Sequence, residues 1–392
     1  MSGASDRTMT RDEVIERARG IAKAAAAQVG RAETLRRLPP ETVAAIMGSG
    51  LMPMMRPRRF GGFGGDWLDL LNACAEIGRV CGAASWCFSF LIHHQWIFAY
   101  FPGAAQDRVY AAATDPKFVV SFAPVGKVRA VAGGWELSGE WPWGSGGDHC
   151  DWAMVNALIP GADGGPPHAR MFLLQPGQFR MRDVWHSVGL KGSGTNNIVV
   201  DPVFVPAELT LNVAEAQEAT APGCRLDEGV LFRSPLTAQA WVGIVSPLIG
   251  VAMGACDAFV DRARTKVSTM GEVVAEAAPM QVAIGESQAE IEAAVALAER
   301  INEALFANQP VTLEHRVRYR RNATAAARLA LRAVDRLFDL GGAQGLAEAG
   351  ALQRHWRDAH AIAHHFALST VGFQNSGRIA LGLGPAPGDP LY

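Results

Sequence analysis

The sequence has few charged and few aromatic residues for its length. Charged residues make up 19% and aromatic residues 8% of the 392 positions, whereas hydrophobic residues make up 49%. The formal net charge is only −2, so the composition offers no basic surface for a nucleic acid. This balance is typical of a folded protein with a large core and excludes a disordered chain.

Several sequence motifs are also missing. The six cysteines form no Cys-x-x-Cys pair, which argues against structural zinc and against a disulfide scaffold and favours a reducing, cytoplasmic environment. There is no Gly-x-Gly-x-x-Gly after a strand and no Walker A sequence, so we expect no Rossmann site for NAD(P)H. The first residues lack an apolar core, so we expect no signal peptide.

Long hydrophobic runs are rare as well. The most apolar stretch, residues 236–260, is interrupted by Gln239, Ser246 and Pro247. A buried helix explains such a stretch better than a membrane span.

Residues 314–332 are locally basic. This pattern favours a solvated helix face over an anion-binding surface.

The periodicity of the chain changes twice. Helical patterns dominate residues 1–116, where Thr10 is a candidate N-cap and Pro40 opens a helix. Short β-rich runs such as KFVVSFAP and NNIVVDPVFVP follow over 117–210, which predicts an antiparallel sheet or barrel. Residues 211–392 begin with a polar stretch that we expect to be a linker or a surface loop, and then return to alanine-rich helices typical of a bundle.

Two segments of the β region and the order of the three regions resemble the acyl-CoA dehydrogenase fold. The segments are GGWELSGEWPWGSGGDHCDW (133–152), with Trp143 followed by Ser145, and WHSVGLKGSGTNNIVVDPVFVP (185–206). The resemblance covers about residues 15–385. It implies an α+β protein with an N-terminal helical domain, a middle β-barrel domain and a C-terminal four-helix bundle.

Further motifs resemble the flavin-dependent monooxygenase branch of that fold, which includes the p-hydroxyphenylacetate and steroid-phenol hydroxylases. In SWCFSFLIHHQWIFAYFP (85–102) Trp86 precedes His94 by eight residues; VSFAPVGKVRAVAGGW supplies Ser121; RDAHAIAHHFAL (357–368) places His365 eight residues after Arg357. Either histidine could instead be its neighbour, His93 or His364. Ser193-Gly194-Thr195 stands where many relatives have Thr-Gly-Ser, and the dehydrogenase glutamate has no match.

The resemblance implies a two-component enzyme that hydroxylates an aromatic, phenolic substrate through a flavin C4a-hydroperoxide. Reduced FAD or FMN would come from a separate NAD(P)H-dependent flavin reductase, O2 would be the oxidant, and the assembly would be a homotetramer without nucleic acid or membrane partners. The expected catalytic residues are His94, Ser121, Ser145 and His365, and the substrate would contact Trp86, His94 and His365. The expected cofactor contacts are Ser145, Gly146, Ser193, Gly194, Thr195, Gly341 and Gly342.

Chemistry gives each of these residues a role. Ser145 lies in a glycine-flanked turn and can hydrogen-bond flavin N5; His94 is the expected donor to the peroxide or substrate oxygen. His365 is the expected base for the phenol, because imidazole titrates near neutrality. Each residue also has a structural alternative: a turn serine, a core histidine or a packed tryptophan.

The three histidines 360, 364 and 365 also raise the question of a metal. His360 and His364 have the i, i+4 spacing of metal ligands, but no further ligand motif joins them, so we expect no metal. Arg357 and Asp358 are expected to fix the helix by ion pairing. Two enzymatic alternatives stay open: an acyl-CoA dehydrogenase-like flavin oxidase, and N- or S-oxygenation on the same fold.

Overall fold

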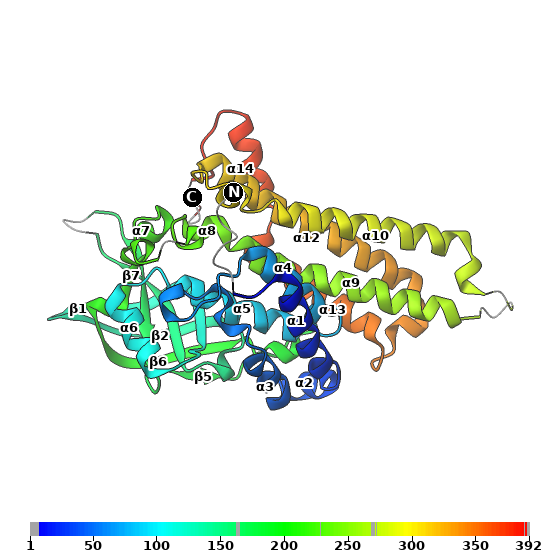
Figure 1. The fold of residues 1–392 in the computed structure, drawn as a ribbon, viewed down its shortest axis with the longest axis horizontal. Coiled ribbons are helices and arrows are strands. Elements are labelled where there is room, and N and C mark those ends of the chain that lie inside the picture. Colours follow the sequence, from blue (N-terminus) through cyan, green and yellow to red (C-terminus); the bar gives the residue numbers. More distant parts are fainter. Residues whose placement is uncertain are drawn as a thin grey trace.

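The sheet comes between two helical parts in the chain, and in Figure 1 it lies at the left, with the N-terminal helices beside it and the long C-terminal helices extending to the right. The computed structural model describes residues 8–161, 165–227, 229–267, 271, 273–387 and 389. The predicted starts of two helices are confirmed: Thr10 caps the first helix in a capping box with Glu13, and Pro40 is the first residue of the third. The N-terminal helices are α1 (Arg11–Ala26), α2 (Val29–Leu35), α3 (Pro40–Gly48), α4 (Trp67–Gly78), α5 (Gly82–Phe98) and α6 (Gly103–Ala112).

The sheet has seven strands in the order β5-β6-β2-β1-β3-β4-β7. Its strands are β1 (Phe118–Val131), β2 (Gly134–Gly144), β3 (Trp152–Ile159), β4 (His168–Leu174), β5 (Arg180–Arg182), β6 (Asn196–Pro206) and β7 (Thr210–Asn212). The expectation of an antiparallel sheet is wrong at one pair, because β1 and β3 are parallel. The hairpin of β1 and β2 returns the chain to its starting end, so Trp152 begins β3 opposite Phe118.

The stretch after β6 is not the linker that its polarity suggested. It forms β7, which pairs with β4, and the short helix α7 (Val213–Gln217). Leu211, Ala216 and Cys224 are buried in this stretch. Its apolar residues therefore close the edge of the sheet instead of joining two free domains.

The C-terminal helices form the elongated part of the molecule (Figure 1). They are α8 (Leu236–Gln239), α9 (Trp241–Thr265), α10 (Ala278–Glu299), α11 (Glu303–Phe306), α12 (Leu313–Gly341), α13 (Ala351–Ala363) and α14 (Val371–Ala380). The apolar stretch is the segment Leu236–Thr265, and 83% of its most hydrophobic window is buried. Because α9 packs against α4, α10, α12 and α13, the prediction of a buried helix is confirmed.

The basic stretch at 314–332 lies within α12, but it is not a uniformly solvated face. Arg320 is only 3% exposed and its guanidinium lies 2.8 Å from the carboxylate of Asp389. The expectation of a solvated surface is therefore wrong for Arg320. The reason is tertiary: the end of the chain folds back over α12 and covers this arginine.

Candidate active site

One face of α5 carries three rings at helical spacing. Trp86, Phe90 and His94 follow one another at intervals of four residues, which places them on the same face. The Trp86 and Phe90 ring centroids lie 4.7 Å apart, and those of Phe90 and His94 lie 5.0 Å apart. Trp86 and His94 are buried, whereas Phe90 is half-buried. The sequence prediction missed Phe90, although its place midway between Trp86 and His94 was a sufficient signal.

A row of three hydroxyl groups lies against this face. Trp86 Nε1 donates to Ser145 Oγ across 3.0 Å, and Ser145 Oγ lies 3.0 Å from Thr195 Oγ1. Thr195 Oγ1 in turn lies 2.7 Å from Ser193 Oγ. All three hydroxyl residues are buried. The structure therefore brings together Trp86 from α5, Ser145 from the end of β2, and the two hydroxyls that precede β6.

The backbone around Ser145 is unusual. Trp143 has a φ of +66°, a left-handed conformation that is rare for an aromatic residue and carries strain of about 1–3 kcal/mol. Its side chain is 66% exposed. Gly146 also has a positive φ, and its N–H donates to the carbonyl of Ser193 across 2.9 Å. This bond joins the Ser145 turn to the segment that carries Ser193 and Thr195.

His94 is held in one tautomer by the sheet. Its Nδ1 lies 2.8 Å from the carbonyl oxygen of Phe118, at the start of β1. A carbonyl can only accept, so Nδ1 carries the hydrogen and Nε2 of the neutral ring keeps its lone pair. Burial lowers the pKa of His94 to about 4. At neutral pH this ring is therefore an uncharged hydrogen-bond acceptor at Nε2.

His365 is held in the opposite tautomer. It lies just beyond the helix that carries Arg357 and Asp358, because α13 ends at Ala363 and His365 caps the next turn. Its Nδ1 accepts the N–H of Ala367 across 3.3 Å, so Nε2 of the neutral ring carries the hydrogen. Burial lowers its pKa to about 4. The ring centroid lies 5.7 Å from that of Trp86, which brings His365 to the same aromatic cluster.

The neighbouring histidines have other contacts. His360 Nε2 lies 2.8 Å from a carboxylate oxygen of Asp335, and His364 Nδ1 lies 2.7 Å from the carbonyl of His360. In the part of the chain that the structure describes, no group of three His, Cys, Asp or Glu residues could hold a metal ion. The ring of His93 lies 4.9 Å from that of His94. Its Nδ1 faces Gly243 of α9, where an added Cβ would lie 2.7 Å away.

The remaining predicted residues lie outside the hydroxyl row. Ser121 is buried on β1 and donates to the carbonyl of Pro142 across 2.8 Å, which ties β1 to the strand end before Trp143. Gly341 and Gly342 mark the predicted helix break at the end of α12. Figure 1 shows α12 running away from the sheet, so its end lies at the far end of the bundle. Within one chain these glycines do not meet Ser145.

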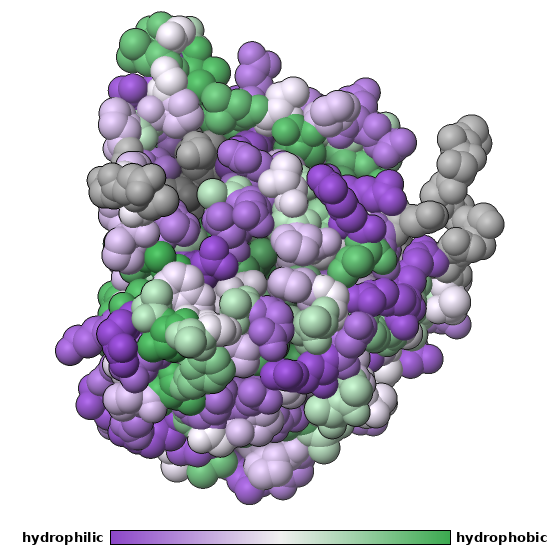
Figure 2. Space-filling view, turned by 90° about the vertical axis from the view of Figure 1, so that its left-hand side faces the viewer, coloured by the Kyte–Doolittle hydropathy of each residue, from purple (hydrophilic) through white to green (hydrophobic). Residues whose placement is uncertain are grey.

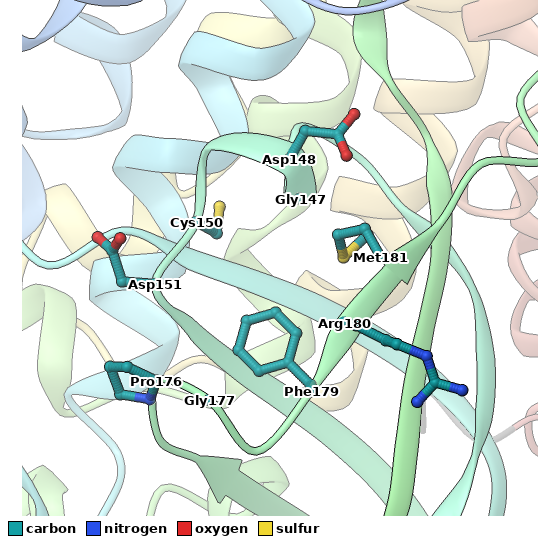
Figure 3. Close-up of a pocket in the computed structure, with 9 residues that line it drawn as sticks. All are labelled: Gly147, Asp148, Cys150, Asp151, Pro176, Gly177, Phe179, Arg180 and Met181. Atoms are coloured by element: carbon teal, nitrogen blue, oxygen red, sulfur yellow. The ribbon is translucent and has the colours of Figure 1, made fainter.

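A cavity of about 340 Å³ lies beside the turn that follows Ser145 (Figure 3). In Figure 3 the Phe179 ring occupies the space below the turn, whereas Arg180 extends away from it, toward its ion-pair partner Asp201. Met181 packs on Gly147, where an added Cβ would lie 2.3 Å from the methionine methyl carbon. The cavity is lined by Gly147, Asp148, Cys150, Asp151, Pro176, Gly177, Phe179, Arg180 and Met181.

Family models of the acyl-CoA dehydrogenases match both helical parts of the chain. The model of the N-terminal domain matches residues 5–109, and that of the C-terminal domain matches residues 242–370. Butyryl-CoA dehydrogenase from Megasphaera elsdenii superposes with a TM-score of 0.78 at 18% identity. These matches confirm the predicted fold.

Three more similar proteins are oxygenases or hydroxylases. The oxygenase subunit HsaA of a flavin-dependent monooxygenase from Rhodococcus jostii is 34% identical, over 86% of this chain and 89% of that protein. The oxygenase component of an FADH2-dependent resorcinol hydroxylase from Rhizobium sp. is 33% identical, over 98% of each chain. The crystal structure of 3-HSA hydroxylase from Rhodococcus sp. RHA1 superposes with a TM-score of 0.91 at 32% identity, over 97% of this chain and 99% of that one. The chain therefore belongs to the oxygenase components of the flavin-dependent monooxygenases that share the acyl-CoA dehydrogenase fold.

Proposed function

We propose that this protein hydroxylates a phenolic ring with O2 and with reduced FAD or FMN from a separate NAD(P)H-dependent reductase. The observation that carries the proposal is the pair of neutral histidines of opposite tautomer beside the Trp86–Phe90 face and the Ser145 hydroxyl. A phenol needs an acceptor for its proton and a flat apolar wall for its ring, and this cluster supplies both. Relatives named for resorcinol and for p-hydroxyphenylacetate support a phenolic substrate.

The residues around Ser145 fit a flavin. An isoalloxazine is a flat ring system with polar edges, and here an exposed Trp143 in a strained turn adjoins three hydroxyls and two glycines with positive φ, Gly146 and Gly194. Ser145, Gly146, Ser193, Gly194 and Thr195 would hold the ring and its side chain. When bound, reduced flavin would supply the two electrons that activate O2, and O2 would supply the oxygen atom that is transferred. XiaF from Streptomyces sp., a structural neighbour at 28% identity and a TM-score of 0.87, was solved with FADH2.

For this cluster we propose roles of the two histidines opposite to those expected from the sequence. We assign His94 as the base, because its Nε2 lone pair can accept the phenol proton, which raises electron density on the ring carbon. We assign His365 as the donor, because its Nε2–H can hydrogen-bond an oxygen that gains negative charge. Their backbone partners, Phe118 and Ala367, fix these tautomers before any ligand binds.

The hydroxyl row gives Ser145 a directed proton. Ser145 Oγ accepts the Trp86 indole hydrogen, and if Thr195 also donates to it, the proton of Ser145 is left to point outward. Ser193 can complete the row by donating to Thr195. Such a row offers one donor to the edge of the flavin, and the buried aromatic residues around it keep water away.

We further propose a homotetramer in the cytoplasm. The resemblance implies that the stretch at Gly341 and Gly342 contacts the flavin of a neighbouring subunit, and Figure 1 shows α12, which ends there, running away from the sheet. Figure 2 shows hydrophobic residues at the top of the molecule, and the exposed hydrophobic residues of α14 and of the segment after it are Phe373, Leu381 and Leu383. A second copy would cover such a patch. The six cysteines are all free, as in a reducing compartment.

The test is a coupled assay with a flavin reductase, NADH, FAD or FMN, and a panel of phenols. We expect a catechol product from at least one phenol and none from its methyl ether, which has no proton for His94 to accept. Substitution His94→Gln should lower the hydroxylation rate about a hundred-fold or more. The control His168→Gln should leave the rate unchanged, because His168 pairs with the last residue of β3, whereas Phe118, the partner of His94, lies opposite its first residue. Equal turnover of the phenol and its ether would contradict the proposal.

A further inference from the structure

Asp358 is a buried carboxylate at the junction of three elements of the site. It lies on α13 and is 3% exposed. Its Oδ1 accepts the backbone N–H of Leu190 across 2.6 Å. Its Oδ2 lies against Gly82, the first residue of α5, where an added Cβ would be 2.7 Å away. Contrary to the sequence expectation, the ion pair of this Arg-Asp motif is made by Arg357 with Glu33, at 2.7 Å, and not by Asp358.

The first of these elements is the segment that ends in the hydroxyl row. Arg357 Nη1 donates to the carbonyl of Val188 across 2.6 Å, and an added Cβ on Gly189 would lie 2.0 Å from the Arg357 carbonyl oxygen. The segment is thus in backbone contact with α13. Leu190 has a φ of +49°, so the bond from its N–H to Asp358 holds a conformation that leucine seldom adopts. Ser193 and Thr195 follow directly.

The second element is α5. Its N-cap residue, Cys81, makes no side-chain hydrogen bond to the first turn, so the partial positive charge of this helix end has no cap of its own. The Asp358 carboxylate lies at this end, where a negative charge is favoured. The helix carries Trp86, Phe90 and His94, so its placement sets the aromatic face and the base together.

The third element is α13 itself, which leads to His365 seven residues after Asp358. Given the proposed function, we propose that the Asp358 carboxylate is a positioning residue that fixes the hydroxyl row, the aromatic face and His365 relative to one another. It touches neither substrate nor flavin. It acts through Leu190, through the first turn of α5 and through the helix on which it lies.

The electrostatics of Asp358 oppose a purely stabilising role. Burial raises its pKa to about 6, and the groups around it are Arg357 and Arg354 of α13, Glu33 of α2 and the Cys81 thiol. The pKa in the folded state lies above the usual value of 3.8, so folding is favoured more strongly as the pH falls through 6. The charged carboxylate therefore lowers the stability of the fold at neutral pH.

Substitution Asp358→Asn distinguishes a role of Asp358 in positioning the site from a role in stabilising the fold. An amide oxygen can still accept from Leu190, but its NH2 group then faces the positive end of α5. We expect an unchanged or higher melting temperature at pH 7.5. In the apoprotein, amide hydrogen exchange in peptides covering 82–90 and 188–195 should be about ten-fold faster or more. Asp335→Asn is the matched control, because Asp335 bonds Trp356 and His360 on the same helix but not the site.

Flavin-dependent readouts follow from the same variant. With reduced FAD or FMN, Asp358→Asn should raise the ratio of H2O2 to hydroxylated product and weaken flavin binding measured by fluorescence titration. The wild-type coupling should decline below about pH 6 while that of Asp358→Asn stays level, since His94 and His365 remain neutral there. Unchanged exchange at 82–90 and 188–195 would overturn the inference whatever the activity. Absence of hydroxylation by the wild type would instead overturn the proposed function.

Discussion

The indole nitrogen of Trp86 and the hydroxyl of Ser145 lie 3.0 Å apart, and their hydrogen bond joins the helical block to the sheet. Because an indole N–H can only donate, it fixes the Ser145 oxygen as an acceptor on that side. Thr195 occupies the other side at 3.0 Å. This contact between two separate parts of the chain therefore keeps the Ser145 proton away from the side that faces Trp86.

Substitution Trp86→Phe tests this relationship. It keeps an aromatic wall but removes the donor, so Ser145 can turn its proton away from the proposed flavin edge. We expect about a five- to ten-fold rise in the H2O2 released per molecule of product, because such a factor corresponds to the net free energy of about one hydrogen bond. The matched control is Trp96→Phe, which removes an equivalent buried bond, to the Leu231 carbonyl. Equal coupling in both variants would show that the indole N–H has no such role.

Acid should destabilise the fold through its buried histidines. Burial lowers the pKa of His94 to about 4 and that of His355 to about 3, whereas the unfolded value is 6.5. Between these values the unfolded chain binds protons that the folded chain does not, so stability is lost as the pH falls below 6.5. For His94 the loss at pH 4 is about 3 kcal/mol. Urea unfolding followed by circular dichroism from pH 7.5 to 4 measures it, and a flat profile would be inconsistent with these pKa values.

The end of the chain should contribute strongly to stability. Asp389 accepts from Arg320 and Asn375, each across 2.8 Å, and the Arg320 and Asp389 side chains are 3% and 6% exposed. Asp389→Ala removes one charged hydrogen-bond partner of the buried Arg320, which should cost about 1.5–3 kcal/mol of unfolding free energy. Asp261→Ala breaks only an exposed pair with Arg264 and should change little. Denaturant unfolding of the two variants decides the point.

The contact between Gly189 and α13 should tolerate no side chain. An alanine Cβ at this position would lie 2.0 Å from the Arg357 carbonyl oxygen, so the backbone must move and the 188–195 segment with it. We expect Gly189→Ala to lower the melting temperature and to weaken flavin binding. Gly20→Ala on α1, with nothing within 4 Å of the added Cβ, should instead stabilise the helix by up to about 1 kcal/mol. A Gly189→Ala protein with normal melting and flavin affinity would disprove the close approach.

Part of the site could be read from the sequence because it is local. The spacing of Trp86 and His94 singled out both residues by resemblance, and helical periodicity could have added Phe90 on the same face. The glycines around Ser145 predicted a tight turn, which Gly146 and its positive φ bear out.

Other features depended on partners distant in the chain. The start of β1 opposite β3 follows from the return of β2, and no local pattern distinguishes that parallel pair from an antiparallel one. The tautomers of His94 and His365 depend on which backbone group meets Nδ1, a carbonyl 24 residues away in one case and an N–H two residues away in the other. Asp358 differs from an ordinary helix carboxylate only because Leu190 and Gly82 meet it in space.

The sequence by itself determined the element types, the family resemblance and the identity of the polar groups, because propensity, periodicity and motif spacing are properties of neighbouring residues. Only the tertiary structure decided how those groups act: which ring nitrogen holds a proton, which group donates to the Ser145 oxygen and which carboxylate is buried. These states depend on hydrogen-bond partners and on exclusion of water, and both are set by segments that meet only when the chain folds.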